Sequence, residues 1–205
     1  MSLDLKEVTL AGFLTCLADR TPTPGGGAVA AASLAIAGAI GHMAIAYSKG
    51  RSSLAEYDSL HDEALSSLSS LATSALDLAE QDAQAYAQLN DLFKRSKDDP
   101  IRIQGWDDAV DAAIAAPLAV MQEADELLKL LERLIVATNP MLHSDLAVAA
   151  ISAEAAARSA NCNVRINLPS VSDVSTAETC RRKADEILDR CRAAASRIEC
   201  ECTAQ

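Results

Sequence analysis

Aromatic side chains are scarce in this chain of 205 residues, which holds two Phe, three Tyr and one Trp. A core built on large rings is therefore excluded. Half of the residues are apolar, so Ala, Leu, Val and Ile must fill the interior, and that composition favours closely packed helices. We predict an all-α fold, and the length fits a single domain over residues 1–205.

Metal-ligand patterns are also lacking. The chain has three histidines, and the spacing of its six cysteines does not resemble paired zinc ligands. Carboxylates are plentiful, but no cluster of mixed ligands stands out. We therefore predict no metal site, and we interpret the cysteines as single buried or surface thiols.

Positive charge is in short supply, since the net charge is −11. No basic run with interleaved aromatic residues is present, which argues against a nucleic-acid partner. An anionic substrate would need a locally positive site. Asp4 and Glu7 interrupt the beginning of the chain, which therefore does not look like a secretory leader. We expect a cytoplasmic protein.

Three of the eight glycines are consecutive, Gly25, Gly26 and Gly27, and they follow Thr-Pro-Thr-Pro. Such a corner can take positive φ, let a ligand approach the backbone, or cradle an anion at a helix start. Residues 28–47 are then apolar or small except for Ser33 and His42. The length could span a bilayer, but long amphipathic helices follow that could wrap this segment. We predict a central helix buried on all sides of a multihelical bundle, and no membrane partner.

One carboxylate interrupts the apolar stripe of the next segment, residues 53–93, which has no Pro or Gly and is predicted to be one long helix. Steps of three and four residues from Leu78 place Asp82 among core positions. A buried carboxylate costs several kcal/mol unless it is paired. Asp82 is therefore the first catalytic candidate. The alternative is that it pairs with an Arg or caps another helix inside the bundle.

Two irregular segments supply further polar candidates. Residues 139–145 lead into a helix, and Ser144 or Asp145 is a natural N-cap, which explains both without a catalytic role. Residues 161–169 are predicted to be extended. The amides of Asn163 and Asn167 present a donor beside an acceptor, which suits the edge of a heterocycle, although they could equally satisfy loop backbone.

Cations follow the central helix at Lys49 and Arg51, on either side of Gly50. A helix end explains them, because its dipole favours positive charge there. The functional alternative is contact with an anionic ligand. Residues 106–137 are predicted to form another helix, which Pro117 should kink because it removes a backbone donor.

Taken together, these residues resemble the cyclodeaminase/cyclohydrolase family of folate enzymes, which includes the C-terminal domain of formiminotransferase-cyclodeaminase and small methenyltetrahydrofolate cyclohydrolases. The resemblance spans nearly the whole chain. It departs from the family at Arg51, where members usually carry Lys, and at His143 and Cys162. The matching motifs, in the order of the family, are Pro22–Gly27, Asp82-x-x-Ala85-Tyr86, Ala116-Pro117, Asn139 with Ser144-Asp145, and Asn163-Val164 with Ile166-Asn167.

The resemblance implies a helical bundle that acts as a homodimer or larger homo-oligomer, without metal or redox cofactor, on a folate substrate. Water would add to the cationic bridge of methenyltetrahydrofolate to give formyltetrahydrofolate. Asp82 or Asp145 would stabilise the cation and direct the water. The implied substrate contacts are Gly25, Gly26, Gly27, Ser144, Asn163 and Asn167, with Lys49, Arg51 or Arg158 at the glutamate tail.

Two other activities stay open at this point. The first is the cyclodeaminase reaction, which expels the formimino nitrogen as ammonia and would use much the same site. The absence of a fused formiminotransferase domain favours hydrolysis by analogy. The second is a non-catalytic folate-binding or assembly protein. For either enzyme, we expect the acids and amides to converge at the glycine corner in one pocket.

Overall fold

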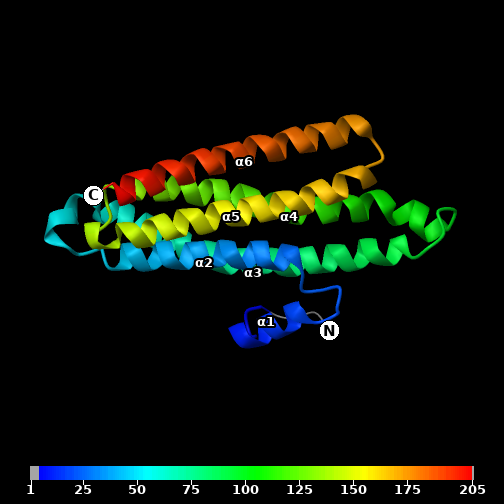
Figure 1. Ribbon diagram of the computed structural model, residues 1–205, viewed down its shortest axis with the longest axis horizontal. Helices are drawn as coiled ribbons and strands as arrows, with labels where there is room; N and C mark the ends of the chain where they lie inside the picture. Colours follow the sequence, from blue (N-terminus) through cyan, green and yellow to red (C-terminus); the bar gives the residue numbers. More distant parts are fainter. Residues whose placement is uncertain (1–4, 205) are drawn as a thin grey trace.

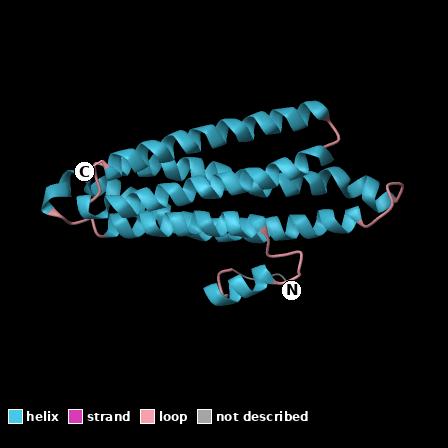
Figure 2. Ribbon diagram, viewed as in Figure 1, coloured by secondary structure: helices cyan, strands magenta, loops and turns pink. Residues whose placement is uncertain are grey.

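The structure is a computed structural model that describes residues 5–204 (Figure 1). Every regular element in this range is helical, with no strand (Figure 2), which confirms the all-α prediction. Short 3-10 helices η1 (Ser52–Tyr57), η2 (Pro140–Leu142) and η3 (Leu168–Ser170) occupy three of the connections. The α-helices are α1 Leu10–Ala18, α2 Gly26–Ala46, α3 Asp58–Phe93, α4 Pro100–Leu134, α5 His143–Asn167 and α6 Val174–Thr203.

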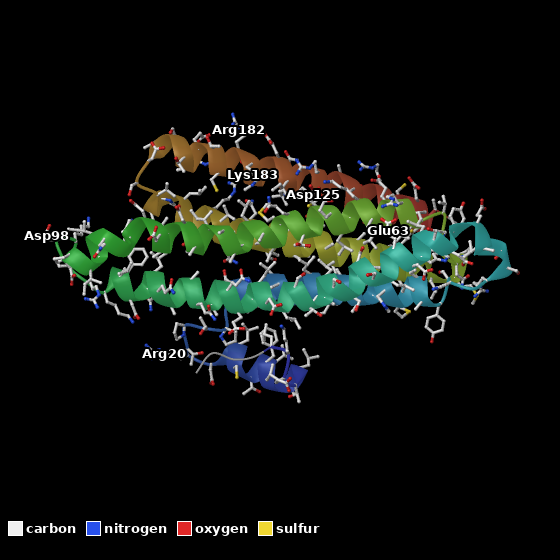
Figure 3. The ribbon with its side chains drawn as sticks, turned by 180° about the vertical axis from the view of Figure 1, so that it is seen from behind. Arg20, Glu63, Asp98, Asp125, Arg182 and Lys183 are labelled. Carbon is white, nitrogen blue, oxygen red and sulfur yellow. The ribbon has the colours of Figure 1, made fainter. Side chains whose placement is uncertain are left out.

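Helices α2 to α5 form an up-and-down bundle, and α6 packs on α4 and α5 (Figure 1). Helix α1 lies outside this bundle, beneath α2 and α3 in the same view. Seen from behind, α3 and α4 come forward, with Glu63 on α3 and Asp98 in the loop that joins the two helices (Figure 3). Because neighbouring helices are antiparallel, the start of α2 meets the end of α5.

Helix α2 carries no Asp, Glu, Lys or Arg, and it packs against α3, α4 and α5. Glycines permit this close approach, since a Cβ at Gly38 would lie 3.3 Å from Leu71 and one at Gly41 would lie 3.1 Å from Leu131. The prediction that α2 is buried on all sides is wrong for the single chain. One side stays open, and Ile36 there is 52% exposed.

Two predicted boundaries are also wrong. Residues 161–169 were expected to be extended, but α5 continues to Asn167 because no Pro or Gly occurs before Pro169 to stop it. The α5 N-cap position is Leu142, so Ser144 and Asp145 lie within the first turn and neither is the cap. An acid at that position is still favoured by the helix dipole.

A buried ion pair joins α4 to α6. Asp125 is 5% exposed, and its Oδ2 accepts hydrogen bonds from Arg190 Nη2 at 2.8 Å and Nε at 3.1 Å. Lys129 Nζ lies 3.1 Å from the same oxygen. Burial alone would raise the pKa of Asp125, but the hydrogen bonds and charges of Arg190 and Lys129 outweigh it and hold the pKa below its usual value.

We expect Arg190→Ala to lower the free energy of unfolding by about 3 kcal/mol, because it leaves a buried carboxylate with one partner. Since the folded pKa of Asp125 is lowered, this stability is present at neutral pH and is lost as the pH falls below about 4. Urea unfolding at pH 7 and pH 3 measures both effects. Arg182→Ala, at an exposed pair 3.9 Å long, is the matched control. A loss below about 0.5 kcal/mol for Arg190→Ala would contradict the assignment.

Candidate active site

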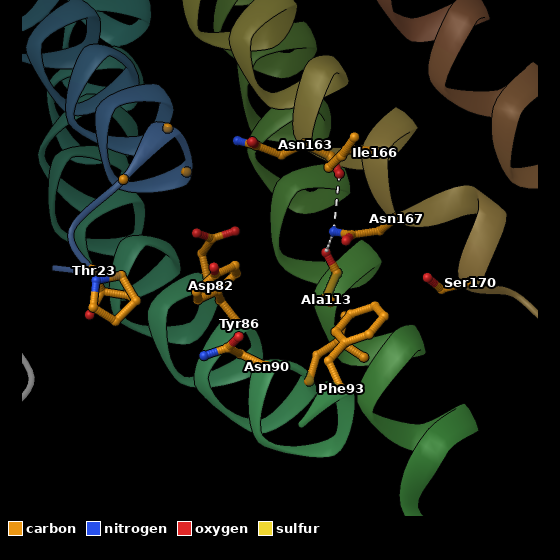
Figure 4. Close-up of a pocket in the computed structure, with 15 residues that line it drawn as sticks. Thr23, Asp82, Tyr86, Asn90, Phe93, Ala113, Asn163, Ile166, Asn167 and Ser170 are labelled. Carbon is orange, nitrogen blue, oxygen red and sulfur yellow. Dashed lines mark hydrogen bonds between the residues drawn. The ribbon is translucent and has the colours of Figure 1, made fainter. Parts of the chain in front are cut away.

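The start of α2, the end of α5 and the facing turns of α3 and α4 enclose a pocket of about 390 Å³ (Figure 4). The glycine corner forms one edge of this pocket, and side chains of α3 and α5 form facing walls. The residues around it are Pro22, Thr23, Gly25, Gly26, Gly27, Asp82, Tyr86, Leu89, Asn90, Phe93, Ala113, Asn163, Ile166, Asn167 and Ser170.

The glycine corner gives room to a carboxylate. A Cβ built on Gly27 would lie 1.9 Å from Asp82 Oδ2, whereas one on Gly26 would lie 3.4 Å from Asn163 Oδ1. Among residues 5–204 the only glycine with positive φ is Gly50, at 77°, so the corner does not use the positive φ that its glycines permit. Glycine is needed at position 27 because α2 and α3 approach each other there with Asp82 between them.

Asp82 has no protein partner in the described part of the chain, where its side chain makes no hydrogen bond or ion pair. The alternative of a structural Arg pair or a helix cap therefore does not apply within one subunit. Burial raises the pKa of this carboxyl, while the nearby N-terminus of α2 favours its negative charge. Such a group can serve as a base near neutral pH or face a cationic ligand.

Two amides hold a donor and an acceptor at the opposite wall, one helical turn apart on α5. Asn163 Nδ2 is buried and has no hydrogen-bond partner within residues 5–204. Asn167 Nδ2 donates to Ala113 O at 2.9 Å and to Asn163 O at 3.1 Å, which leaves its Oδ1 to accept. The pocket therefore offers a free donor beside a free acceptor, as the edge of a heterocycle requires.

Pro117 explains why Ala113 O is available to Asn167. In an α-helix the N–H of residue 117 would bond to the carbonyl of residue 113, but proline has no N–H. Asn167 supplies the missing donor across the helix interface. The sequence predicted that Pro117 would kink helix α4. In the structure, Pro117 leaves the carbonyl of Ala113 free to accept a hydrogen bond that orients the Asn167 side chain.

Aromatic side chains form the outer end of the pocket. Tyr86 and Phe93 are 46% and 53% exposed, and the ring of Phe93 meets Trp106 edge-on at 5.1 Å between centroids. The Arg102 guanidinium lies 4.3 Å from the Trp106 ring centroid, and Trp106 Nε1 donates to Ser170 O. Continued beyond Asp82, the same steps of three and four residues reach Tyr86 and Phe93. Their place on the same stripe as Asp82 was the signal that could have marked them as pocket residues.

The remaining predicted site residues lie at the other end of the bundle. Asp145 and Asn163 are both on α5, about 27 Å apart at 1.5 Å per residue, and Ser144 lies one residue further away. Arg51 follows the C-terminal end of α2. The expected convergence therefore holds for Asp82, Gly25–Gly27 and both asparagines. It fails within one subunit for Arg51, Ser144 and Asp145, because α2 and α5 run their full length between the two groups.

Lys49 and Arg158, the other two cations predicted to contact the glutamate tail, form ion pairs within the chain instead. Lys49, at the far end, forms an ion pair with Asp62. Arg158 lies 3.5 Å from Glu154, four residues earlier on the same helix, which is the spacing of a surface ion pair. Neither side chain lines the pocket.

The chain is similar to several known proteins that are named for cyclohydrolase or cyclodeaminase activity. The chain is 28% identical over 194 residues to a methenyltetrahydrofolate cyclohydrolase of Methylorubrum extorquens, which covers 93% of each chain. It is 27% identical over 198 residues to the formimidoyltransferase-cyclodeaminase of Mus musculus. This match covers 95% of the present chain but only 37% of the mouse protein. A solved formiminotetrahydrofolate cyclodeaminase from Thermotoga maritima superposes with a TM-score of 0.88 at 24% identity, over 97% of this chain and 98% of that one.

The family model for formiminotransferase-cyclodeaminase matches residues 9–186. This range contains the glycine corner, Asp82, Pro117 and both pocket asparagines. The chain therefore belongs to the formiminotransferase-cyclodeaminase family.

Proposed function

We propose that this chain is a methenyltetrahydrofolate cyclohydrolase, which hydrolyses the bridge of methenyltetrahydrofolate to give formyltetrahydrofolate. The observation that carries the proposal is the unpaired Asp82 carboxylate beside Gly27. The methenyl bridge is a cation, and an unpaired, half-buried anion is the group that a bound cation would stabilise. The curated Methylorubrum extorquens relative, of which the chain covers 93%, bears the cyclohydrolase name.

In the proposed reaction the bridge carbon is already electrophilic, so the protein mainly supplies placement and proton transfer. Asp82 takes a proton from water as the water oxygen bonds to the bridge carbon. The bond from that carbon to the ring nitrogen N5 then breaks, N5 receives a proton, and one proton is released overall. The raised pKa of Asp82 makes it a stronger base than an ordinary aspartate.

The two asparagines would hold the pterin. Asn163 Nδ2 can donate to a ring nitrogen or carbonyl, and Asn167 Oδ1 can accept from the amino group. Tyr86 and Phe93 offer apolar faces toward the rest of the ligand. This chemistry needs no metal or redox cofactor, because no electrons are transferred and the substrate carries its own activating charge.

The second candidate is formiminotetrahydrofolate cyclodeaminase, the name of the solved Thermotoga maritima neighbour; several relatives of similar identity are named formimidoyltransferase-cyclodeaminase. Its reaction forms the methenyl bridge and releases ammonia. The same Asp82 would then act as the acid that protonates the departing nitrogen, a role that its raised pKa also suits. A third candidate is a folate-binding protein without turnover.

One absorbance assay separates these three candidates. We expect the purified chain to bleach the methenyltetrahydrofolate band, with formyltetrahydrofolate as product and no ammonia released from formiminotetrahydrofolate. Ammonia release accompanied by growth of the band would instead establish the cyclodeaminase. Folate binding with no change in the methenyltetrahydrofolate band and no release of ammonia would establish a folate-binding protein and contradict both enzymatic candidates.

A prediction about the amide wall follows from Pro117. Pro117→Ala restores an N–H that competes with Asn167 for Ala113 O, so we expect about a tenfold rise in KM, the equivalent of one hydrogen bond. The same change should raise Tm, because proline is unfavourable inside a helix. Asn167→Ala is the comparison: we expect its KM to rise about as much as that of Pro117→Ala, without any rise in Tm. An unchanged KM for Pro117→Ala would contradict the role given to Ala113 O.

We also propose that the protein works in the cytoplasm as a single-domain subunit of a homodimer or larger homo-oligomer, without nucleic acid or membrane. The open side of α2 supports an assembly, since it leaves apolar side chains uncovered. Among residues 5–204, α2 is the one helix long and apolar enough to cross a bilayer, and half of it is buried in the bundle. The mass of the purified chain in solution tests the oligomeric state.

A further inference from the structure

Large apolar side chains are uncovered at the outer end of the pocket. Tyr86 and Phe93 of α3 are 46% and 53% exposed, and Ile166 of α5, on the facing wall, is 74% exposed. Figure 4 shows the α3 side chains following Asp82 along the helix toward its C-terminal end. Apolar surface left open inside a pocket marks contact with a ligand. This part of the pocket therefore suits the flat, apolar middle of a ligand, which aromatic side chains can pack against.

An amide lies between the two rings of α3. Asn90 lines the pocket one turn beyond Tyr86 and one turn before Phe93. Within residues 5–204 its side chain makes no hydrogen bond. A primary amide can donate to a carbonyl and accept from an N–H at the same time. The outer half of the pocket therefore offers apolar contacts and one uncommitted amide.

The Arg102 guanidinium stands at the end of this row. It lies 4.3 Å from the centroid of the Trp106 ring and 5.9 Å from that of Phe93. Trp106 is itself held in place, because its Nε1 donates to Ser170 O at 3.0 Å and its ring meets Phe93 edge-on. Ser170 and Phe93 both line the pocket. The aromatic platform under Arg102 is therefore continuous with the pocket wall.

The charge of Arg102 is not neutralised by a carboxylate of the described chain, residues 5–204. Its Nη1 donates to the carbonyl oxygen of Arg95 at 2.8 Å. The neighbouring carboxylates have other partners: Asp107 Oδ1 accepts from Ser172 Oγ at 2.7 Å, and Asp99 Oδ2 pairs with Arg95 Nη1 at 3.2 Å. A guanidinium has five N–H groups in one plane. Those that do not face Arg95 remain available to an incoming carboxylate.

Positive charge gathers at this end of a chain whose net charge is −11. Residues 94–102 hold four cations and two carboxylates. Lys97 lies with Arg102 around a hollow beside Trp106, and it makes no ion pair within residues 5–204. An anionic part of a ligand is attracted to such a cluster. At the other edge of the pocket, Arg20 comes two residues before Pro22, but no ring in the described range supports its side chain.

The distance along α3 matches the length of a folate. Phe93 is eleven residues beyond Asp82, or about 16 Å at 1.5 Å per residue. In a folate, the aminobenzoyl ring and its amide separate the bridge carbon from the glutamate carboxylates by about 10–13 Å. One water between Asp82 and the bridge carbon adds about 3 Å. A folate with its bridge at Asp82 therefore brings its glutamate to Arg102.

We propose that the pocket binds its folate with the aminobenzoyl ring between Phe93 and Ile166 and with a glutamate carboxylate on Arg102. The benzoyl amide then lies at Asn90. This inference rests on the proposed function for the identity of the ligand, and it makes Arg102 a determinant of substrate specificity. Because the guanidinium is remote from the bridge carbon, it binds the ground state and the transition state alike, and it acts on KM rather than on kcat.

A comparison of two substrates tests this role. Methenyltetrahydropteroate has the same reacting bridge as methenyltetrahydrofolate but lacks the glutamate. We expect the unaltered chain to show a KM about tenfold lower for the folate, the equivalent of one charge-assisted hydrogen bond. Arg102→Gln should raise the KM for the folate to that for the pteroate. It should leave the KM for the pteroate and both kcat values unchanged, which a merely structural role of Arg102 would not do.

Three further variants complete the comparison. Arg102→Lys keeps the charge but loses the planar fork, so its preference for the folate should be intermediate. Arg20→Gln removes the cation at the other edge of the pocket, and it should keep the full preference. Arg182→Gln, at an exposed pair on α6, is the remote control and should also match the unaltered chain.

Several outcomes would overturn the inference. These are an equal KM for both substrates in the unaltered chain, a preference that survives Arg102→Gln, and a preference that is lost in Arg20→Gln instead. An equal rise in KM for both substrates in Arg102→Gln would show that the residue only supports the fold of the pocket.

A binding measurement separates this inference from the proposed function. Calorimetric titration with tetrahydrofolate and tetrahydropteroate needs no turnover, and we expect the same roughly tenfold ratio of Kd, which Arg102→Gln should abolish. The fluorescence of Trp106, the single tryptophan of the chain, should change on binding of tetrahydrofolate. If the unaltered chain turns over neither folate, the proposed function fails, and the ratio of Kd values alone decides the role of Arg102. Turnover without any effect of Arg102→Gln on that ratio would overturn the inference and leave the proposed function standing.

Discussion

Asp82→Asn is expected to lower kcat/KM for methenyltetrahydrofolate by about 10²- to 10⁴-fold, the usual contribution of a general base. The amide keeps the shape of the carboxylate but can neither accept a proton nor balance the cationic bridge. The substitution should not lower the stability of the folded state. Because burial raises the folded pKa of Asp82, ionisation favours the unfolded state as the pH rises, so at neutral pH the Tm of Asp82→Asn should equal or exceed that of the parent.

The pH profile gives an independent measure of the same group. Since Asp82 must be ionised to act as a base, wild-type activity should fall on the acid side at a pH above the ordinary aspartate value of about 3.9. The residual activity of Asp82→Asn should lack this fall. Asp91→Asn changes an exposed acid of α3 that is paired with Lys94, and it should match the parent. Equal activity of Asp82→Asn and Asp91→Asn would remove Asp82 from the mechanism.

Gly27→Ala is expected to reduce turnover by about 10²-fold or more while the protein stays folded. The new methyl group would lie 1.9 Å from Asp82 Oδ2, so the carboxylate must move, and a displacement of about 1 Å from the reacting geometry has this effect. A helical glycine replaced by alanine is ordinarily stabilising by about 0.5–1 kcal/mol. Loss of activity without loss of helicity by circular dichroism is therefore the expected signature.

Other glycines provide the comparison for Gly27→Ala. A Cβ at Gly105 would meet Leu92 Cδ1 at an ordinary 3.7 Å, away from the pocket. Gly105→Ala should keep full activity and gain slightly in stability. Gly26→Ala, whose Cβ would touch Asn163 at 3.4 Å, should have an intermediate effect. If Gly27→Ala and Gly105→Ala behave alike, the glycine corner does not serve to make room for Asp82.

The sequence predicted the helical class and the pocket at the glycine corner because both depend on local patterns. The step from Leu78 to Asp82 put a carboxylate on an apolar stripe, and the structure places it against Gly27. Asn163 and Asn167 were chosen for their amides in a segment thought to be extended. They line the pocket as neighbours on a helical face, so the predicted extended structure was wrong, while their contact with substrate stays a prediction.

What the sequence could not predict depends on relations between helices. Nothing local connects Pro117 with Asn167, which meet only because α4 and α5 pack with Ala113 O facing the amide. Likewise, the direction and length of α5 decide that Asp145 lies at the far end from Asn163. The open side of α2 has the same origin, since an all-round apolar helix does not reveal whether its own chain or a second copy covers it.

A crystal structure of the Asp82→Asn protein with methenyltetrahydrofolate would show whether the substrate lies between residue 82 and the two asparagines. We expect the bridge carbon beside the residue 82 side chain, close enough for an intervening water, and the pterin edge on Asn163 Nδ2 and Asn167 Oδ1. A pterin bound elsewhere, with this pocket empty, would contradict this expectation.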